Sequence, residues 1–396
     1  MLSCKICSKK INKKLSFSNL PVSNFFSKSK NKGIKNFEVY LCSNCKFIQV
    51  KNNFKQKDIQ PSLKFIKQRE PEDHLDKIAK NLDNLFDDKL KKKINILGIS
   101  YKDQSLIKRL KRIGYRNAKI LRYSSLNKNN VSNIFENIEF EFSENFSKIK
   151  KKYSSQDLII SRHLLEHLDE TSTFLNKIKQ LSRNRNSYIY LEIPDSKKPL
   201  DNFDYGMFWE QHRSYFLKKN FLSYLNLNNI KKIKYTSYNY NYENCLLFIG
   251  KFNTEKILKK KSYFTKQNNT YRYFKKFRIV KKKINNGIRA FKNERKKIAI
   301  FGCGHQSVLL CHIFGINKFI DFYFDNNKNL QGYNFPGTSS KIHNPYKYSK
   351  SVDICLTCAN YSNEEKIRKK NKNIFKTYPK FISLIMTNKK GIKKFL

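Results

Sequence analysis

Two closely spaced cysteine pairs near the N-terminus constrain this chain more than any other feature. Cys4 and Cys7 form one C-x2-C pair, and Cys42 and Cys45 form another after 34 intervening residues. Four thiolates are the ligand set of a closed, tetrahedral zinc site, in which each pair presents two sulfur atoms to one metal ion. Such a site has no open coordination position, so it predicts a structural Zn²⁺. The interval leaves room for a strand, which we expect at 37–41. The alternative is four unrelated buried cysteines.

The charge of the chain is extreme, but its distribution argues against a dedicated nucleic-acid surface. The net charge is +51 over 396 residues, and the lysines are spread along the whole sequence. Lys, Asn, Ile, Phe and Tyr are abundant while Gly and Pro are scarce, which is the signature of an AT-rich genome. We therefore expect no specific nucleic-acid partner, although a zinc-ribbon nucleic-acid-binding protein remains an alternative.

Other features of the composition indicate a cytoplasmic protein of two or three domains. No run of about 18 apolar residues occurs, so we expect no membrane insertion. The N-terminus lacks the apolar segment of a secretory signal. Nine cysteines, four of them in the predicted metal site, suit a reducing compartment.

The pattern of apolar segments predicts an α/β protein, with a small N-terminal zinc-binding module followed by two Rossmann-like, doubly wound domains. We place the module at 1–58, the first α/β domain at 70–253, a basic helical linker at 254–296 and the second α/β domain at 297–396. The aromatic residues of the linker are expected to pack on a domain, or alternatively to stack on single-stranded nucleic acid. Within the first domain we expect a strand at 138–142 and a helix at 163–181.

Each α/β domain opens with a strand, a glycine turn and a helix, which predicts a ligand at the carboxyl ends of the strands. In the first domain we predict a cofactor pocket lined by Gly98, Ser100, Tyr101, Ser161, Arg162 and His163. In the second domain Gly302 and Gly304 indicate either a ligand contact or only a tight turn.

His163 to His167 also matches the H-x-x-E-H pattern of one class of zinc peptidases. If 163–181 is helical, both histidines lie on one helical face. The segment directly follows a buried strand, however, and Leu164, Leu165 and Leu168 occupy core positions. We therefore do not expect a peptidase metal here.

Several segments together resemble the sugar C-methyltransferases of deoxysugar and surface-polysaccharide pathways. They are the four cysteines, DLIISRHLLEHLDETSTFL at 157–175, LEIPD at 191–195, EQHRSYFLKKNFL at 210–222, IAIFGCGHQSVLL at 298–310 and IDFYFDNNKNLQGYNFPGT at 320–338. The resemblance implies a zinc-binding N-terminal domain, a central class I methyltransferase domain that binds S-adenosylmethionine (SAM), and a C-terminal Rossmann-like domain.

The resemblance also implies a reaction at carbon. Such enzymes remove a C–H proton beside the ketone of a nucleotide-linked sugar, and the resulting enolate takes the SAM methyl group. This requires a general base, and the resemblance assigns that role to His212, with Gln211 and Tyr215 beside it. Gln211 stands where the family has Glu, and Trp209 where it has Tyr. Alternatively, His212 is a structural residue.

The predicted cofactor pocket departs from the family as well. Its glycine motif is reduced to Gly98, and Arg122 stands where an acidic residue would accept hydrogen bonds from the SAM ribose. A second alternative is therefore a degenerate homologue that binds a nucleotide-sugar without transferring methyl groups. We predict no oligomeric state.

Overall fold

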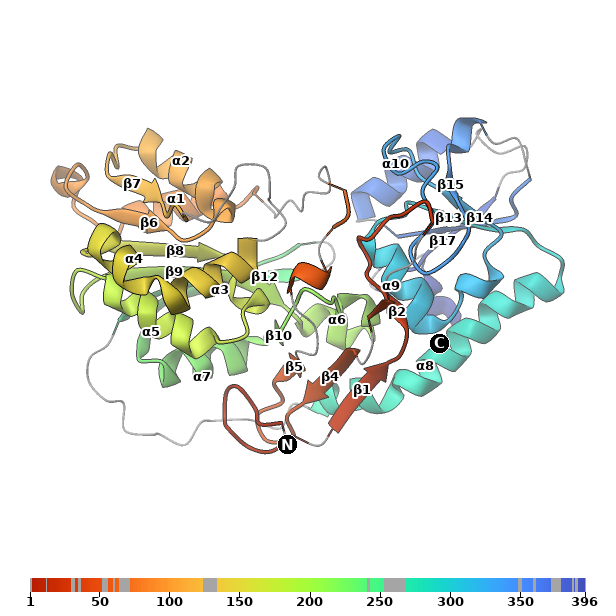
Figure 1. Ribbon diagram of the computed structural model, residues 1–396, viewed down its shortest axis with the longest axis horizontal. Helices are drawn as coiled ribbons and strands as arrows, with labels where there is room; N and C mark the ends of the chain where they lie inside the picture. Colours follow the sequence, from red (N-terminus) through yellow and green to blue (C-terminus); the bar gives the residue numbers. More distant parts are fainter. Residues whose placement is uncertain are drawn as a thin grey trace.

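The computed structural model describes residues 2–11, 13–29, 33–34, 37–51, 56–59, 61–63, 72–123, 134–240, 243–252, 268–347, 351–358, 361–371, 379–386, 388 and 391–395. Two lobes flank the N-terminal module (Figure 1). No helix within these ranges is long and apolar enough to cross a membrane.

The N-terminal module is a small antiparallel sheet that borrows its last strand from the central domain. Its own strands are β1 (Lys13–Phe17), β4 (Phe37–Leu41) and β5 (Ile48–Val50), while β2 (Leu20–Pro21) pairs separately with β3 (Gly33–Ile34). The strand predicted at 37–41 is confirmed as β4. Strand β10 (Ser214–Tyr215) pairs with β5, so the segment that carries His212 is tied directly to the module.

The central domain is built on a six-stranded sheet in the order β11-β12-β9-β8-β6-β7. Strands β7 (Ala118–Ile120), β6 (Ile96–Gly98), β8 (Leu158–Arg162) and β9 (Tyr188–Asp195) are parallel, and β12 (Asn244–Phe252) runs antiparallel between β9 and β11 (Ile230–Tyr238). The helices are α1 (Leu75–Asp83), α2 (Gln104–Arg112), α3 (Ile134–Glu144), α4 (Phe146–Tyr153), α5 (Thr171–Leu181), α6 (Lys197–Asp201) and α7 (Lys218–Leu227).

The C-terminal domain is a second, all-parallel sheet in the order β15-β14-β13-β16-β17. Its elements are β13 (Ile298–Phe301), α9 (His305–Phe314), β14 (Phe322–Phe324), β15 (Ile342–His343), β16 (Ile354–Thr357), α10 (Tyr361–Asn371) and β17 (Lys380–Ser383). Two parallel α/β units are therefore present, and the predicted fold class is confirmed. The domain boundaries themselves stay predictions.

The long helix α8 (Asn268–Asn293) runs along the lower side of the C-terminal lobe (Figure 1). Its apolar positions recur at helical spacing and are buried: Tyr273, Phe274, Phe277, Val280, Ile284 and Ile288. They share one core with strands of the N-terminal module, the segment before β10 and the C-terminal sheet. The expected aromatic helix that packs on a domain is thus found within the linker, whose residues 254–267 lie outside the described ranges.

Two expected elements are wrong. Residues 138–142 belong to helix α3: Ile138 and Phe142 are buried, as helical spacing requires, whereas a strand would also bury Phe140, which is 53% exposed. The helix expected at 163–181 begins only at Thr171. His163 has a φ of 45° and its amide still donates to Glu192 O, extending the pairing of β8 with β9. A short 3₁₀ turn, Leu165–His167, follows.

Candidate active site and metal centre

The four N-terminal thiols converge on one point. The sulfur atoms of Cys4 and Cys45 lie 3.4 Å apart and those of Cys7 and Cys42 lie 3.5 Å apart. A tetrahedral zinc ion with Zn–S bonds of about 2.3 Å places its sulfur ligands roughly 3.8 Å apart. No described cysteine is in a disulfide. The donor set and its spacing therefore fit a closed zinc site.

Both cysteine pairs are shaped by the same local turn. Ser8 N donates to Cys4 O and Lys46 N donates to Cys42 O, at 2.9 and 3.0 Å. Ser8 and Lys46 both have positive φ values, 55° and 59°. Repetition of this turn at two distant sequence positions points both sulfur pairs inward, as a shared ligand would require.

The strand order of the central sheet reverses direction between β6 and β8. The region at the carboxyl ends of these two strands, where α/β sheets bind their ligands, is here called the crevice. Asp103 organises this end of the sheet: one carboxylate oxygen accepts a hydrogen bond from Ser100 N and the other from Arg162 N, both at 2.8 Å. Burial raises the pKa of Asp103 to about 7, although these amide donors oppose the shift. Ser161 also lies here, and its buried hydroxyl has no hydrogen-bond partner among the described residues.

Gly98 does not leave space for a ligand. A Cβ atom at this position would lie 2.6 Å from Ile120 Cδ1 and 2.9 Å from Asp103 Cβ. The missing side chain is therefore required by the packing of the turn against β7 and α2. Tyr123, after β7, covers the same turn and donates a hydrogen bond from its hydroxyl to Ile99 O at 2.8 Å.

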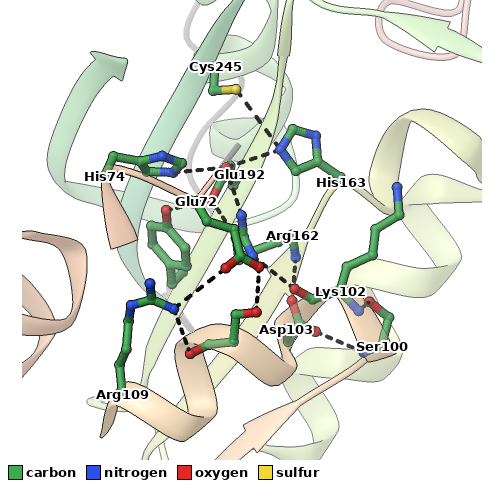
Figure 2. A network of polar contacts seen from close by, with 12 residues as sticks. Glu72, His74, Ser100, Lys102, Asp103, Arg109, Arg162, His163, Glu192 and Cys245 are labelled. Atoms are coloured by element: carbon green, nitrogen blue, oxygen red, sulfur yellow. Dashed lines mark hydrogen bonds and ion pairs between the residues drawn. The ribbon is translucent and has the colours of Figure 1, made fainter. Parts of the chain in front are cut away.

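Behind the crevice lies a buried charge network centred on Glu192 (Figure 2). Its oxygens accept hydrogen bonds from the Arg162 guanidinium (2.7 and 3.3 Å), the Tyr190 hydroxyl (2.9 Å), and the His74 and His163 rings (3.0 Å each). Burial alone would raise the pKa of Glu192, but the hydrogen bonds from the two histidines and the Arg162 charge hold it well below its usual value. The carboxylate is fully used within the protein.

A second cluster of side chains lies beside this network, at the turn after β8. Glu166, His167 and His212 place ligand-type atoms within 4.8 Å of one another. The His167 and His212 rings meet edge to face at 4.7 Å. His167 Nδ1 hydrogen-bonds to Gln211 O at 3.1 Å, and burial lowers the pKa of His167 well below its usual value. His212 is partly exposed, whereas His167 is buried.

Trp209 connects this cluster to the C-terminal domain. Its ring lies 5.0 Å from His212 and 5.0 Å from His305, the first residue of α9. Burial lowers the pKa of His305 to about 4, so this imidazole is neutral near pH 7. The cluster is therefore placed where both α/β domains meet.

Comparison with known proteins identifies the C-terminal part of the chain. Residues 254–385 match a family of domains described as the C-methyltransferase C-terminal domain. This part of the chain is thus similar to the C-terminal domain of C-methyltransferases. The prediction of a methyltransferase and its resemblance to C-methyltransferases are thereby confirmed, whereas the family description names no sugar. The matched residues include the segment we predicted to be a linker.

Solved structures of several methyltransferases resemble part of the chain. Magnesium protoporphyrin IX methyltransferase of Synechocystis PCC 6803 is 11% identical (TM-score 0.32), covering 45% of this chain and 82% of that one. DszA carbon methyltransferase is also 11% identical (TM-score 0.32), covering 46% and 54%. The 1,6-didemethyltoxoflavin-N1-methyltransferase of Burkholderia thailandensis is 9% identical (TM-score 0.29), covering 46% and 77%. No curated protein sequence matches the chain. These distant similarities carry no argument about substrate.

Within the matched residues, the turn at Gly302 is explained by backbone geometry. Gly302 has a φ of 90°, which favours glycine, and Cys303 N donates to the Asp325 carboxylate at 2.7 Å. Gly304 has an ordinary φ of −72°, and nothing lies within 4 Å of where its Cβ would be. A tight turn thus accounts for Gly302, while the space beside Gly304 is open.

The structure brings the residues predicted from sequence into two adjacent groups. Ser100, Tyr101 and Ser161 lie at the crevice, and Arg162 and His163 lie in the buried network behind it. His212 lies in the histidine cluster. Gln211 directs its amide to Ile59 O at 3.4 Å, and the Tyr215 hydroxyl bonds to the backbone of Trp209. The roles of these residues stay predictions.

Sequence reasoning missed His74, Glu192 and His305 as members of the site. Glu192 and His305 lie within segments that carry the family resemblance, so that signal was available. His74 precedes α1 far from the other residues in sequence, and it meets Glu192 only through the tertiary fold.

Proposed function

We propose that this protein is a SAM-dependent C-methyltransferase whose substrate is a nucleotide-linked keto-deoxysugar. The observation that carries the proposal is the position of His212, a partly exposed imidazole between the central crevice and the matched C-methyltransferase domain. The central sheet supports the proposal. Strand β12 runs antiparallel between β9 and β11, which point in the same direction, and this is the arrangement of class I methyltransferases.

His212 is the proposed general base that removes the C–H proton beside the substrate ketone. A base must offer an unprotonated nitrogen to the substrate. Its neighbour His167 cannot take this role, because it is buried and its Nδ1 is bound to Gln211 O. The aromatic ring of Trp209 borders His212 and is itself packed against the neutral ring of His305, so Trp209 would limit the access of water to the proton-transfer step.

SAM, when bound, supplies an electrophilic methyl group to the substrate carbon. We place it at the carboxyl ends of β6 and β8, where Ser161 offers an unpartnered buried hydroxyl and Tyr101 is exposed. Ser100 and Tyr101 would line this position from the β6 turn. The Arg162 guanidinium and the His163 ring support it from behind through Glu192, since their polar atoms already have protein partners.

The four-cysteine site is proposed to hold one structural Zn²⁺ per chain through Cys4, Cys7, Cys42 and Cys45. All four positions would be filled by thiolates, so the ion would stabilise the module and take no part in the reaction. Metal analysis should find one equivalent of zinc. Less than about half an equivalent, with four reactive thiols, would contradict this assignment.

Calorimetry with SAM and with S-adenosylhomocysteine tests the proposed function most directly. Saturable binding of both, lost on replacing Ser161 by Leu to fill the crevice, is the expected result. Absence of binding would favour the degenerate homologue, for which the filled space at Gly98 is the supporting observation. A titration with nucleotide-sugar alone then separates a sugar-nucleotide-binding homologue from a protein that binds neither ligand.

A further inference from the structure

Helix α8 is more basic than the rest of this basic chain. Nine of its 26 residues are Lys or Arg, and none is Asp or Glu. The whole chain has 82 basic and 31 acidic residues among 396, so average composition would give about five basic and two acidic residues in this length. The bias of the overall composition therefore does not account for the charge of α8.

Packing fixes the direction in which these charges point. Tyr273, Phe277, Ile284 and Ile288 hold one side of α8 in the core that it shares with the N-terminal module and the C-terminal sheet. The opposite side faces solvent on the outside of the C-terminal lobe (Figure 1). It carries a row of exposed cations about 25 Å long at 1.5 Å per residue. They are Arg272, Lys275, Arg278, Lys282, Lys283 and Arg289.

Two large side chains with apolar atoms are exposed within this row: Ile279 is 56% and Tyr271 is 44% exposed. The Nζ atom of Lys13, at the start of β1, lies over the Tyr271 ring, 3.4 Å from its centroid. The hydrogen bond and charge of Lys13, with the charges of Lys275 and Lys46, lower the pKa of Tyr271. The N-terminal module thus adds cations to the same end of the helix.

The form of this surface indicates the kind of partner that it fits. Like charges held along one helix face repel one another, so an anionic partner would stabilise them. The row is long and straight, and it places an exposed isoleucine between cations. Helices that lie on anionic bilayers present this combination, because the cations meet the headgroups while the apolar side chain reaches the boundary of the acyl chains.

A nucleic acid fits the same surface less well. Single-stranded nucleic acids are held by aromatic rings on which the bases stack. Tyr273, Phe274 and Phe277 are buried, and one face of the exposed Tyr271 ring is covered by Lys13. An exposed Ile279 also adds nothing to contacts with phosphates.

We propose that the outer face of α8, together with Lys13 of β1, docks the protein peripherally on a bilayer that contains anionic lipids. The helix would lie parallel to the bilayer, with Lys275, Arg278 and Lys282 at the headgroups. It would not enter the hydrocarbon, because its other side is bound in the protein core. This docking is independent of the proposed methyl transfer, and either can fail without the other.

Cosedimentation of the full-length protein with vesicles tests the docking. The protein should bind vesicles of phosphatidylcholine and phosphatidylserine, and it should not bind vesicles of phosphatidylcholine alone. Raising NaCl from about 0.1 to 0.5 M should weaken the binding, because salt screens exposed charges. Absence of binding to the anionic vesicles, or equal binding to both kinds of vesicle, would overturn the proposal.

A variant of α8 locates the contact. Changing Lys275, Arg278 and Lys282 together to Gln should weaken binding to the anionic vesicles by roughly 100-fold, since each cation near the surface contributes to binding. Gln has nearly the helix propensity of Lys and Arg, so the fold should be kept, which circular dichroism verifies.

The matched control changes three exposed lysines of α4, in the central domain: Lys148, Lys150 and Lys151. Replacing them by Gln lowers the net charge of +51 by the same amount, and binding should stay within a few-fold of the parent. Equal weakening in the two triple variants would show that total charge, and not the face of α8, drives the binding. That result would overturn the proposal.

Ile279 separates a lipid surface from a nucleic acid. Ile279→Gln should weaken binding to the anionic vesicles by roughly fivefold, since it removes the apolar contact, and should not change binding to a single-stranded oligonucleotide. Suppose instead that the parent binds the oligonucleotide more tightly than the vesicles, that the α8 triple variant loses this binding, and that Ile279→Gln binds vesicles as the parent does. The face would then be a nucleic-acid surface, and the lipid proposal would be wrong.

Discussion

His212 and Gln211 are adjacent in sequence, but their side chains have different surroundings. The His212 ring lies against His167 and Trp209, whereas the Gln211 amide reaches Ile59 in the segment after the N-terminal sheet. The turn between Trp209 and Arg213 separates them, because His212 N donates to Trp209 O and Arg213 N donates to Glu166 O. A role for Gln211 beside the base would therefore act through the backbone carbonyl that holds His167.

Replacing His212 tests the base assignment. His212→Ala should lower turnover by about 10²–10⁴ and leave SAM affinity nearly unchanged, because a general base acts on the chemical step. Single-turnover kinetics and calorimetry measure the two quantities. His343→Ala, on the edge strand β15, is the matched control and should retain turnover. Unaltered turnover in His212→Ala would make His212 a structural residue.

Gln211 offers a milder test of the same idea. If a carboxylate supports the base, as the family pattern implies, Gln211→Glu should maintain or raise turnover. The structure adds a cost, since Glu would lose the hydrogen bond that Gln211 donates to Ile59 O. We therefore expect maintained turnover together with a melting temperature lowered by a few degrees. A large loss of turnover in a folded variant would show that the site is built for another substrate.

Glu210 should make the folding stability of the protein depend on pH in a way that can be assigned to this one side chain. It is buried, its Oε1 accepts hydrogen bonds from Ser23 N and Oγ at 2.8 and 2.7 Å, and burial raises its pKa from 4.5 to about 7. The folded protein thus holds this proton more tightly than the unfolded chain. Its stabilising contribution is complete below pH 4.5 and is lost as the pH rises through about 7.

Glu210→Gln should remove this dependence, since the amide is neutral at every pH and can keep the Ser23 contacts. Relative to the parent, the variant should gain unfolding free energy between pH 5 and pH 8, by up to roughly 3 kcal/mol at about 1.4 kcal/mol per pKa unit. Urea unfolding at both pH values measures this gain. The prediction would be contradicted if the difference in unfolding free energy between parent and variant were the same at pH 5 and at pH 8.

At the level of secondary structure, the sequence correctly predicts the strand, turn and helix that open each α/β domain. In these units the apolar residues of the sequence are also the buried ones. Helix α9 runs from His305 to Phe314, because Gly304 precedes its start and Gly315 ends it with a φ of 67°. The strand predicted at 138–142 is part of helix α3, because five residues of alternating polarity are compatible with the repeat of a strand and with that of a helix. The tertiary packing of Ile138 and Phe142 decides for the helix.

The two glycine turns make a matched pair of tests. Gly98→Ala should destabilise the protein by about 1–3 kcal/mol, because its Cβ would overlap Ile120 and Asp103. Gly304→Ala should change stability by less than about 0.5 kcal/mol, since its backbone is unstrained and the space is open. Urea denaturation measures both. Equal effects in the two variants would mean that these contacts do not explain Gly98.

In the whole molecule, the N-terminal module is joined by hydrogen bonds and packing to the segment that contains the proposed base, His212. Strand β10 completes the sheet of the module, and the Glu210 carboxylate binds Ser23. The same core continues through Phe17, Phe208 and Phe277 into α8. A metal ion in the four-cysteine site would therefore support the region around His212 without touching it.

Zinc removal should consequently disturb the distant site. Chelation, or Cys42→Ser, should increase amide hydrogen exchange at 205–216 and lower turnover, and added Zn²⁺ should restore the chelated parent but not the variant. Exchange at α10, in the C-terminal domain, serves as the internal reference. Unchanged protection at 205–216 in zinc-free protein would show that the module and the site are energetically independent.

Features that depend on local spacing could be predicted from the amino-acid sequence alone. The two C-x2-C pairs predicted the convergent thiols, and the strand–glycine–helix order predicted two α/β units. Residues at the ends of β6 and β8 were placed together from sequence, because parallel strands bring their carboxyl ends to one edge.

Which of those side chains turn into the protein interior depends on tertiary contacts. Arg162 and His163 turn toward Glu192, because a buried carboxylate needs nearby donors. His74 reaches Glu192 although more than a hundred residues separate them in the sequence. Trp209 contacts His305, which belongs to the C-terminal domain. No local pattern encodes such contacts, since they arise from how the sheets and the N-terminal module pack together.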